Sequence, residues 1–285
     1  MAEPNQPKLD LFSPQEIAAK VAESGERKTR LTILNTFLLA ILAGMYIAFG
    51  AVFSSVSITG MSGVWPFGFM KVTAGLTFSL GLILVVLSGA ELFTGNSLMV
   101  ISWIHKKIDA AQLLRNWTIV YIGNFAGSLL IAFLVLLGKM YTFSNGELGK
   151  AMLSTANAKI QLTFIQALVL GVLCNILVCL AVWMAVSSRT TGGKVLAIVF
   201  PIAAFIAAGF EHSVANMYII PVGLMIKTFD PAFISSLGLD MSSLSWGSFL
   251  VRNLLPVTLG NILGGGFISI LYAQIFPTAA KKTGN

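Results

Sequence analysis

Glu91, Glu211 and His212 are ionisable residues that lie inside long apolar stretches of the chain. An ionisable side chain deep in a membrane is costly unless it faces protein or water, so these residues are candidates for function. The two carboxylates stand in matching motifs, G-x-E-x-x-x-x-N, at residues 89–96 (the first glutamate motif) and 209–216 (the second glutamate motif). We favour a structural role for them, because an anionic lining would hinder anion passage; the alternative is a ligand for a substrate or a proton. The group expected to support interrupted backbone is Glu91, Glu211, Asn96 and Asn216.

His212 could do the acid–base chemistry, since an imidazole changes its charge near neutral pH and can carry a proton or present a cation to an anion. Leu92 occupies the matching place in the first glutamate motif, so His212 breaks the internal symmetry. Thr94 and Asn175 are the polar residues expected to accompany it. These three residues form the predicted central polar site.

Four apolar residues near the two motifs could narrow a passage. They are Phe78, Leu82, Leu92 and Phe205. Their ordinary interpretation is apolar core, and the alternative is a constricted, partly dry pore that excludes hydrated ions. Lys159, at the outer end of a stretch, is either a simple topology charge or a charge that draws anions to the entrance.

The elements that position these residues are predicted to be membrane helices. Only 10% of the residues are charged and 56% are hydrophobic, which argues against a water-soluble enzyme and against disorder. A crossing needs about 20 apolar residues. Six stretches qualify, at residues 33–58, 68–104, 112–138, 160–187, 195–226 and 249–276. The sequence therefore predicts an all-α membrane protein with six transmembrane helices.

The second and fifth stretches are expected to be broken. Both are longer than a crossing requires, and both glutamate motifs are rich in Gly, Ser, Thr and Asn, which favour turns and caps over helix interiors. Non-helical backbone at this depth is tolerated only where it is buried in protein or lines a cavity. The half-helices that start near residues 94–96 and 213–216 would then direct their positive ends towards the membrane centre, where they favour a small anion.

A self-comparison of the chain indicates an internal repeat. Residues 115–127 and 252–264 share the pattern R-N-x6-G-N-x-x-G, and the two glutamate motifs form a second match. A shorter match, which chance could also produce, pairs Thr36-Phe37 and Gly44 with Thr163-Phe164 and Gly171. Because the first copy holds three crossings, the second copy enters the membrane from the opposite side, as in transporters with inverted repeats. The glycines of the R-N pattern are expected to let helices approach closely.

Charge predicts the orientation. Most of the 18 Lys and Arg residues fall on the side that holds both chain ends, which places the termini in the cytoplasm. We expect three parts: a cytoplasmic segment at 1–30, a channel domain at 31–278 and a cytoplasmic tail at 279–285. Ser13 to Glu16 form a capping-box pattern that opens a short amphipathic helix, either a surface helix, which we favour, or a gate.

Metal and cofactor chemistry find no support in the sequence. Cys174 and Cys179 share one apolar stretch without a neighbouring His or acidic residue, so we expect small core residues and neither a disulfide nor a metal site. There is no nucleophile constellation, phosphate loop or dinucleotide motif, and no cofactor is expected. An enzyme is therefore the least favoured class.

Three segments together resemble the signatures of the formate/nitrite transporter family. Residues 78–82 read FSLGL, residues 89–96 read GAELFTGN, and residues 209–217 read GFEHSVANM. The resemblance runs from about residue 10 to the C-terminus. It implies an aquaporin-like fold with discontinuous second and fifth helices, a homopentamer with one pore in each protomer, and bidirectional movement of formate and similar monovalent anions across the bacterial inner membrane.

The resemblance also implies roles for single residues. Leu82 and Leu92, with Phe78 and Phe205, would form two apolar constrictions. His212, with Thr94 and Asn175, would be the central site, and Lys159 the charge at the entrance. The N-terminal segment would regulate the cytoplasmic mouth, and a cytoplasmic formate-metabolising enzyme is a possible partner there.

The resulting hypothesis is a channel through which formate crosses at least one dry constriction as formic acid, protonated at or near His212, because an ion crosses such a gap at high cost. A nitrite or hydrosulfide channel of the same family is the nearest alternative. A membrane assembly subunit without transport is the alternative from another class.

Overall fold

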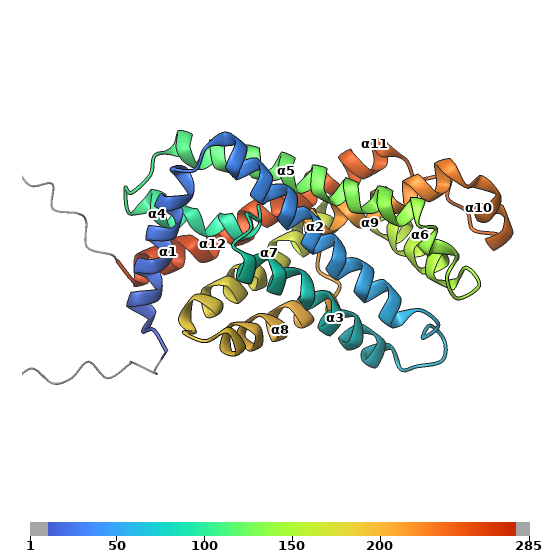
Figure 1. Ribbon diagram of the computed structural model, residues 1–285, viewed down its shortest axis with the longest axis horizontal. Coiled ribbons are helices and arrows are strands. Elements are labelled where there is room, and N and C mark those ends of the chain that lie inside the picture. Colours follow the sequence, from blue (N-terminus) through green and yellow to red (C-terminus); the bar gives the residue numbers. More distant parts are fainter. Residues whose placement is uncertain (1–10, 278–285) are drawn as a thin grey trace, which may run out of the picture.

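The computed structural model describes residues 11–277, and their regular secondary structure is helical throughout. Both ends of the described chain lie at the same end of the elongated molecule, on the left of Figure 1. We call this end the terminal side and the opposite end the far side. Residues 1–10 of the predicted cytoplasmic segment and the predicted tail at 279–285 lie outside the described residues.

Four of the six crossings are continuous. They are α2 (Ile33–Ile58), α5 (Ala110–Leu137), α7 (Phe164–Ser187), and a last crossing that joins α11 (Trp246–Ser248), the π-helical η3 (Phe249–Leu254) and α12 (Leu255–Ile275). A π-turn inserts an extra residue into a helix and re-aims its side chains. Here it turns Asn253 into the protein, where the residue is fully buried.

The second and fifth crossings are interrupted, as the sequence predicts (Figure 1). The second consists of α3 (Phe67–Ser88), the 3-10 turn η1 (Gly95–Leu98) and α4 (Met99–Ile104), and the fifth consists of α8 (Thr191–Ala207) and α9 (Ser213–Phe229). By length and composition alone, five helices of the described residues can span a membrane, and α9 passes only together with α10 (Pro231–Leu237), from which it is bent by 100°. α8 has 17 residues and is joined to α9 by the non-helical residues 208–212, and the two helices together make up the fifth crossing.

Each break begins at a glycine in the left-handed conformation. Gly89 has φ +76° and Gly209 has φ +75°, a region that other residues adopt only with strain. Just after each glycine, the next N–H donates back to the helix that has ended, from Ala90 to Val85 O and from Phe210 to Phe205 O, both at 3.0 Å. The chain then leaves the helix axis, and residues 90–94 and 211–212 of the two loops are buried.

A further helix precedes the first crossing of each half. α1 (Pro14–Thr29) lies across the terminal side and packs on α4 and α7, and it begins with the predicted capping box. α6 (Glu147–Ile160) lies on the far side and packs on α9. The far side also carries η2 (Met140–Thr142) and α10, where the Tyr141 hydroxyl donates to Asp230 at 2.9 Å. Each structural half therefore contains one helix more than the three crossings that the repeat predicts.

The inverted repeat is present, but one predicted match is out of register. Asn124 Nδ2 donates to Ala40 O and Asn261 Nδ2 donates to Gly171 O, both at 2.8 Å, so Ala40 is the structural counterpart of Gly171. The pairing of Gly44 with Gly171 is therefore wrong. The correct register also matches Thr32 with Thr163, since each hydroxyl caps the first crossing helix of its half.

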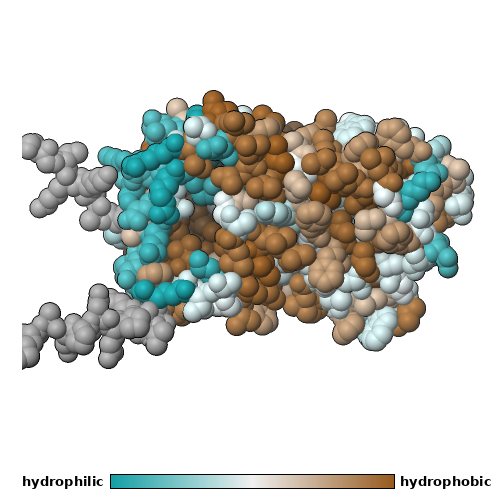
Figure 2. All heavy atoms as spheres, in the orientation of Figure 1, coloured by the Kyte–Doolittle hydropathy of each residue, from teal (hydrophilic) through white to brown (hydrophobic). Residues whose placement is uncertain are grey.

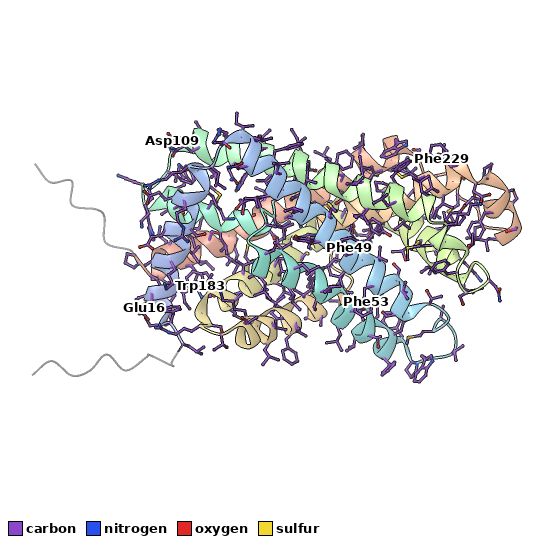
Figure 3. All side chains as sticks on the ribbon, in the orientation of Figure 1. Glu16, Phe49, Phe53, Asp109, Trp183 and Phe229 are labelled. Atoms are coloured by element: carbon purple, nitrogen blue, oxygen red, sulfur yellow. The ribbon has the colours of Figure 1, made fainter. Side chains whose placement is uncertain are left out.

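Small residues let the crossings touch at backbone distance. Gly127 lies against the Ile41 carbonyl of α2, and its counterpart Gly264 lies against the Val172 carbonyl of α7. The prediction of close helix packing through these glycines is confirmed. The face of the molecule seen in Figure 2 is mainly apolar between its two ends. Phe49 and Phe53 of α2 are among the exposed apolar side chains (Figure 3). Such a belt suits contact with lipid or with another apolar surface.

Candidate functional site

An apolar cluster closes the middle of the molecule between the two breaks. The Phe78 and Phe205 rings pack edge to face with centroids 5.7 Å apart, and both residues are buried, at 2% and 1% exposure. Leu82 lies one helical turn beyond Phe78 on α3, and Leu92 lies in the first break; each is 2% exposed. The four predicted constriction residues are therefore brought to the same region, where they exclude water.

One cavity reaches this cluster from each side. The terminal-side cavity has a volume of about 440 Å³ and is lined by residues that include Leu82 and Leu92. The far-side cavity, about 470 Å³, is lined by residues that include Phe78, Phe205 and His212. Phe78 and Leu82 are four residues apart on one helix, so the apolar barrier between the cavities is only about 6 Å thick along α3.

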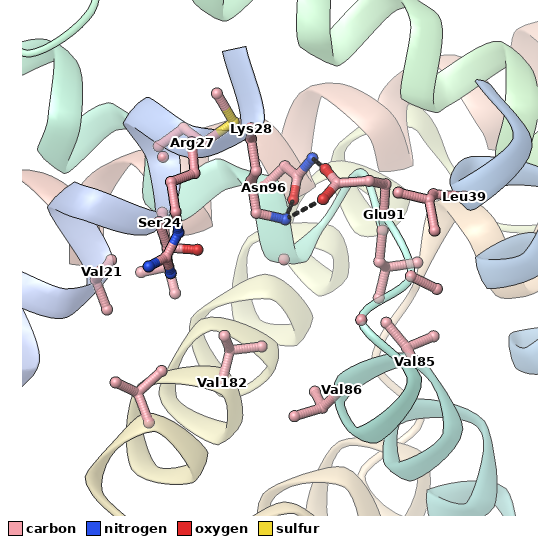
Figure 4. A pocket seen from close by; sticks show the side chains of 18 of the residues that line it. Val21, Ser24, Arg27, Lys28, Leu39, Val85, Val86, Glu91, Asn96 and Val182 are labelled. Atoms are coloured by element: carbon pink, nitrogen blue, oxygen red, sulfur yellow. Dashed lines mark hydrogen bonds and ion pairs between the residues drawn. The ribbon is translucent and has the colours of Figure 1, made fainter. Parts of the chain in front are cut away.

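A lysine, a glutamate and an asparagine meet in the terminal-side cavity (Figure 4). Lys28 Nζ, in the last turn of α1, donates to Glu91 Oε1 at 2.7 Å and to Asn96 Oδ1 at 2.8 Å. Asn96 Nδ2 donates to Glu91 Oε2 at 2.7 Å and to Asn116 Oδ1 at 2.8 Å. The carboxylate is thus paired and hydrogen-bonded at 4% exposure, as a buried charge requires.

The far-side cavity repeats this arrangement. Lys159 Nζ, in the last turn of α6, donates to Glu211 Oε1 at 2.7 Å. Asn216 Nδ2 donates to Glu211 Oε2 and to Asn253 Oδ1, each at 2.7 Å. The predicted entrance charge is therefore held in an ion pair, with 16% of the Lys159 side chain exposed. Each glutamate pairs with a lysine and also accepts from the asparagine at the other end of its break. The backbone amides of the break are bonded by other residues.

Two asparagines hold the interrupted backbone. Asn124 accepts from Phe93 N at 2.9 Å and donates to Glu91 O at 2.9 Å, in addition to its bond with Ala40. Asn261 accepts from Ser213 N at 2.9 Å and donates to Glu211 O at 3.0 Å. Each side chain uses its whole amide group on backbone atoms that the break has left without helical partners. The sequence predicts only close helix packing for this pattern, and the structure shows that the two asparagines also hold the breaks.

His212 caps α9 and is hydrogen-bonded at both ring nitrogens. Its Nδ1 accepts from Ala215 N at 3.0 Å, and its Nε2 lies 2.8 Å from Thr94 Oγ1. Because Nδ1 already accepts a hydrogen, the geometry assigns the neutral imidazole with its proton on Nε2, which donates to Thr94. Charging His212 would place a second proton on Nδ1 and break the cap of α9.

The predicted partners of His212 are separated by the structure. Thr94 reaches the imidazole, but Asn175 donates to Ser97 Oγ at 3.0 Å and to Asn261 O at 2.6 Å. Asn175 Oδ1 has no hydrogen-bond partner among the described residues. The amides of Ser213 and Ala215 bond to protein side chains, so the start of α9 offers fewer N–H groups to an anion than the sequence indicates.

Sequence reasoning missed Lys28 as a site residue. It lies in the polar N-terminal segment, where a lysine is counted as a topology charge. The signal that could have found it is its place four residues before Thr32, which matches the place of Lys159 before Thr163. The sequence places Asn116 and Asn253 in the repeat but assigns them no function. In the structure Asn116 accepts from Asn96, and Asn253 accepts from Asn216.

The site suits passage of a small neutral molecule between two charged vestibules. No group of three or more His, Cys, Asp or Glu among the described residues could hold a metal ion, and Cys174 and Cys179 are buried as free thiols. An ion crossing the apolar barrier would lose its hydration without compensating charges, whereas a neutral weak acid loses much less.

Comparison with known proteins gives consistent matches. Residues 15–275 match a family model described as formate/nitrite transporter. The chain is 44% identical over 264 residues to the formate channel FocA of Escherichia coli, with 91% of this chain and 92% of the relative covered. It is 40% identical over 258 residues to the formate channel FocA of Haemophilus influenzae, with 89% and 90% covered.

Two solved structures share the fold over nearly their whole length. A pentameric formate channel with formate bound has a TM-score of 0.79 at 42% identity, with 86% of this chain and 98% of that chain covered. An FNT family ion channel has a TM-score of 0.80 at 29% identity, with 92% and 99% covered.

Proposed function

The chain belongs to the formate/nitrite transporter family, and on that premise we propose that it is a homopentameric channel that conducts formate and similar small monovalent anions across the bacterial inner membrane. The terminal side faces the cytoplasm, in agreement with the excess of basic residues there. The relatives named as formate channels support the substrate, and the pentameric neighbour supports the assembly. These names describe channels and transporters, and we propose transport without chemical change of the substrate.

The observation that carries the proposal is the short apolar barrier between two cavities, each of which contains a lysine. Formate is attracted as an anion by the positive charge of Lys159 on one side and of Lys28 on the other. It crosses the barrier of Phe78, Phe205 and the two leucines as formic acid. The net movement is therefore one formate and one proton together.

His212 acts in this mechanism as a neutral hydrogen-bond donor. Its Nδ1 is committed to the cap of α9, so the proton that converts formate to formic acid comes from a hydronium ion of the solution that fills the cavity, which leaves a water molecule behind. The Nε2–H, which Thr94 accepts at rest, is free to turn to an oxygen of the permeating acid at the edge of the barrier. This modifies the role expected from the sequence, in which the imidazole could itself deliver the proton.

The experiment is a formate-uptake assay in proteoliposomes that contain a pH reporter. Wild-type protein is expected to acidify the interior as formic acid enters and dissociates. Competing nitrite, acetate and hydrosulfide fluxes rank the substrates. Electrogenic uptake without acidification would contradict passage as the neutral acid.

Two variants of the same residue separate the possible roles of His212. His212→Asn keeps a side chain that caps a helix and can donate a hydrogen bond, but it cannot titrate. His212→Phe removes both abilities. We expect proton-coupled flux to persist in the Asn variant and to fall by about 10-fold or more in the Phe variant. Loss of flux in both variants, with folded protein in both, would assign the proton to the imidazole after all.

We also propose that α1 controls the cytoplasmic mouth, because Lys28 ties this helix to Glu91 of the first break. Docking of a formate-metabolising enzyme on the N-terminal segment remains part of this proposal. Its test is co-purification of the full chain with such an enzyme, compared with a chain that begins at residue 13.

A further inference from the structure

His212 is not the only place where a leucine of the first half corresponds to a hydrogen-bonding residue of the second half. The register of the glutamate motifs matches Leu92 with His212 and, six residues later in each, Leu98 with Tyr218. Leu98 lines the terminal-side cavity and Tyr218 lines the far-side cavity. At both places a leucine of the terminal-side half is replaced by a residue that can donate a hydrogen bond in the far-side half.

Tyr218 lies on the face of α9 that borders the far-side cavity. Residues 215, 218, 219 and 222 all line it, with the spacing that places side chains on one helix face. His212 caps the same helix and lines the same cavity. Long side chains in helices lean towards the N-terminus of their helix, so the Tyr218 ring extends in the direction of His212 and the barrier.

The Tyr218 hydroxyl has no hydrogen-bond partner among the described residues, although the residue is only 1% exposed. Leaving a buried hydroxyl unpaired costs about 1 to 3 kcal/mol, so such a group in a native protein calls for an explanation. Two other tyrosines of the chain have partners: Tyr121 bonds with Thr258 at 2.8 Å and Tyr141 donates to Asp230 at 2.9 Å.

Several other donors of the far-side cavity are already committed. Lys159 donates to Glu211, as described above. Ser55 and Thr155 line the cavity, and each hydroxyl donates to a carbonyl of its own helix, at 2.9 Å and 2.8 Å. The phenol of Tyr218 lines the same cavity and is uncommitted among the described residues.

We propose that the Tyr218 hydroxyl is a substrate-binding group of the far-side cavity, which donates a hydrogen bond to an oxygen of the small carboxylate or related anion before it crosses the barrier. This inference rests on the proposed function, because it names a site for the same substrate. A phenol donates strongly to an anionic oxygen without adding charge. It therefore holds the substrate beside His212 and does not trap it as a lysine would. Since Leu98 offers no such donor, substrate binding is tighter from the far side than from the cytoplasmic side.

The test is the substitution Tyr218→Phe, which removes the hydroxyl and keeps the ring. Formate uptake is measured in proteoliposomes of known orientation, with formate applied to the far side or to the terminal side. We expect the half-saturating formate concentration to rise about 3- to 10-fold from the far side, with little change in the maximal rate. From the terminal side it stays close to the wild-type value. The matched control is Tyr121→Phe, which removes a hydroxyl bonded to Thr258 and leaves both half-saturation values unchanged.

Each outcome decides the inference. Equal half-saturation values for Tyr218→Phe and the wild type would overturn it while leaving formate transport intact. A large drop in thermal stability, or loss of the folded protein, in Tyr218→Phe would also overturn it, because the hydroxyl would then be bonded within the protein. If the wild type itself shows no saturable formate flux, the proposed function fails first, and that result is recognised before any variant is compared.

Discussion

The two interrupted crossings have the same supports and different linings. In both, a glycine with positive φ ends a helix, an asparagine from a neighbouring crossing holds the break, and a lysine pairs with the motif glutamate. The linings differ at two matched positions, where Leu92 and Leu98 of the first half correspond to His212 and Tyr218 of the second half. The repeat thus builds one scaffold twice, and at these two positions the far-side cavity has a hydrogen-bonding residue where the terminal-side cavity has a leucine.

The two lysines are carried by helices that are connected to the rest of the chain in different ways. Lys159 lies in the last turn of α6, and α6 is joined to a crossing at both of its ends, to α5 through η2 and to α7, so its position is set by the crossings themselves. Lys28 belongs to α1, a helix that lies on the surface of the terminal side (Figure 1). The same ion pair therefore lies within the channel body in one half, and in the other half we expect the helix that carries the lysine to be able to move away from the crossings.

The largest expected effect comes from the asparagines that hold the breaks. Asn124→Leu leaves Phe93 N, Ala40 O and Glu91 O without their partner, and Asn261→Leu does the same to Ser213 N, Gly171 O and Glu211 O. We expect each to lower the free energy of unfolding by about 3 to 6 kcal/mol, and by similar amounts, since the supports are equivalent. Thermal unfolding in detergent measures this. If one variant lost more than twice as much free energy of unfolding as the other, the two asparagines would not be equivalent supports.

The next effect distinguishes the two ion pairs. Glu211→Gln leaves Lys159 buried without a countercharge and is expected to cost about 2 to 3 kcal/mol. Glu91→Gln is expected to cost about 1 kcal/mol, because Lys28 can move out into water with α1. The same unfolding assay compares them, and the double variants Lys28→Met/Glu91→Gln and Lys159→Met/Glu211→Gln are the controls. Equal losses for the two single variants would show that α1 is as firmly held as α6.

The sequence predicts most of this scaffold because its signals are local. Glycine, serine and asparagine in the two glutamate motifs cannot hold a buried helix, so both breaks are visible in the sequence. The first crossing of the repeat is placed wrongly because Gly44 and Gly171 match by residue type, whereas the true counterparts, Ala40 and Gly171, share only a carbonyl that accepts from an asparagine. Lys28 can be found from the sequence only in the register that matches Thr32 with Thr163. Asn175 could not be placed, because its partners, Ser97 and Asn261, lie on segments far away in the sequence.

The smallest expected effect compares the glycines through which α1 and α6 dock. A Cβ at Gly149 of α6 would meet the Tyr141 carbonyl at 2.5 Å and the Phe233 ring at 2.7 Å, neither of which can turn aside. A Cβ at Gly25 of α1 would meet both the hydroxyl group of Ser102, which donates to Ala22 O, and its Cβ at 2.9 Å, so we expect relief to come from a shift of α1 away from α4. Alanine also gains about 1 kcal/mol over glycine inside a helix.

We therefore expect Gly149→Ala to cost about 1 to 2 kcal/mol in thermal unfolding and Gly25→Ala to leave it within about 0.5 kcal/mol. The measurement that separates the two halves is amide hydrogen exchange. Gly25→Ala should speed exchange in residues 14–29 and leave the crossings unchanged, because α1 can loosen without the channel body. Slower exchange of α1, or faster exchange that spreads into α4 and α7, would mean that this helix is an integral part of the crossing bundle, and the contrast between a fixed and a detachable lysine would no longer hold.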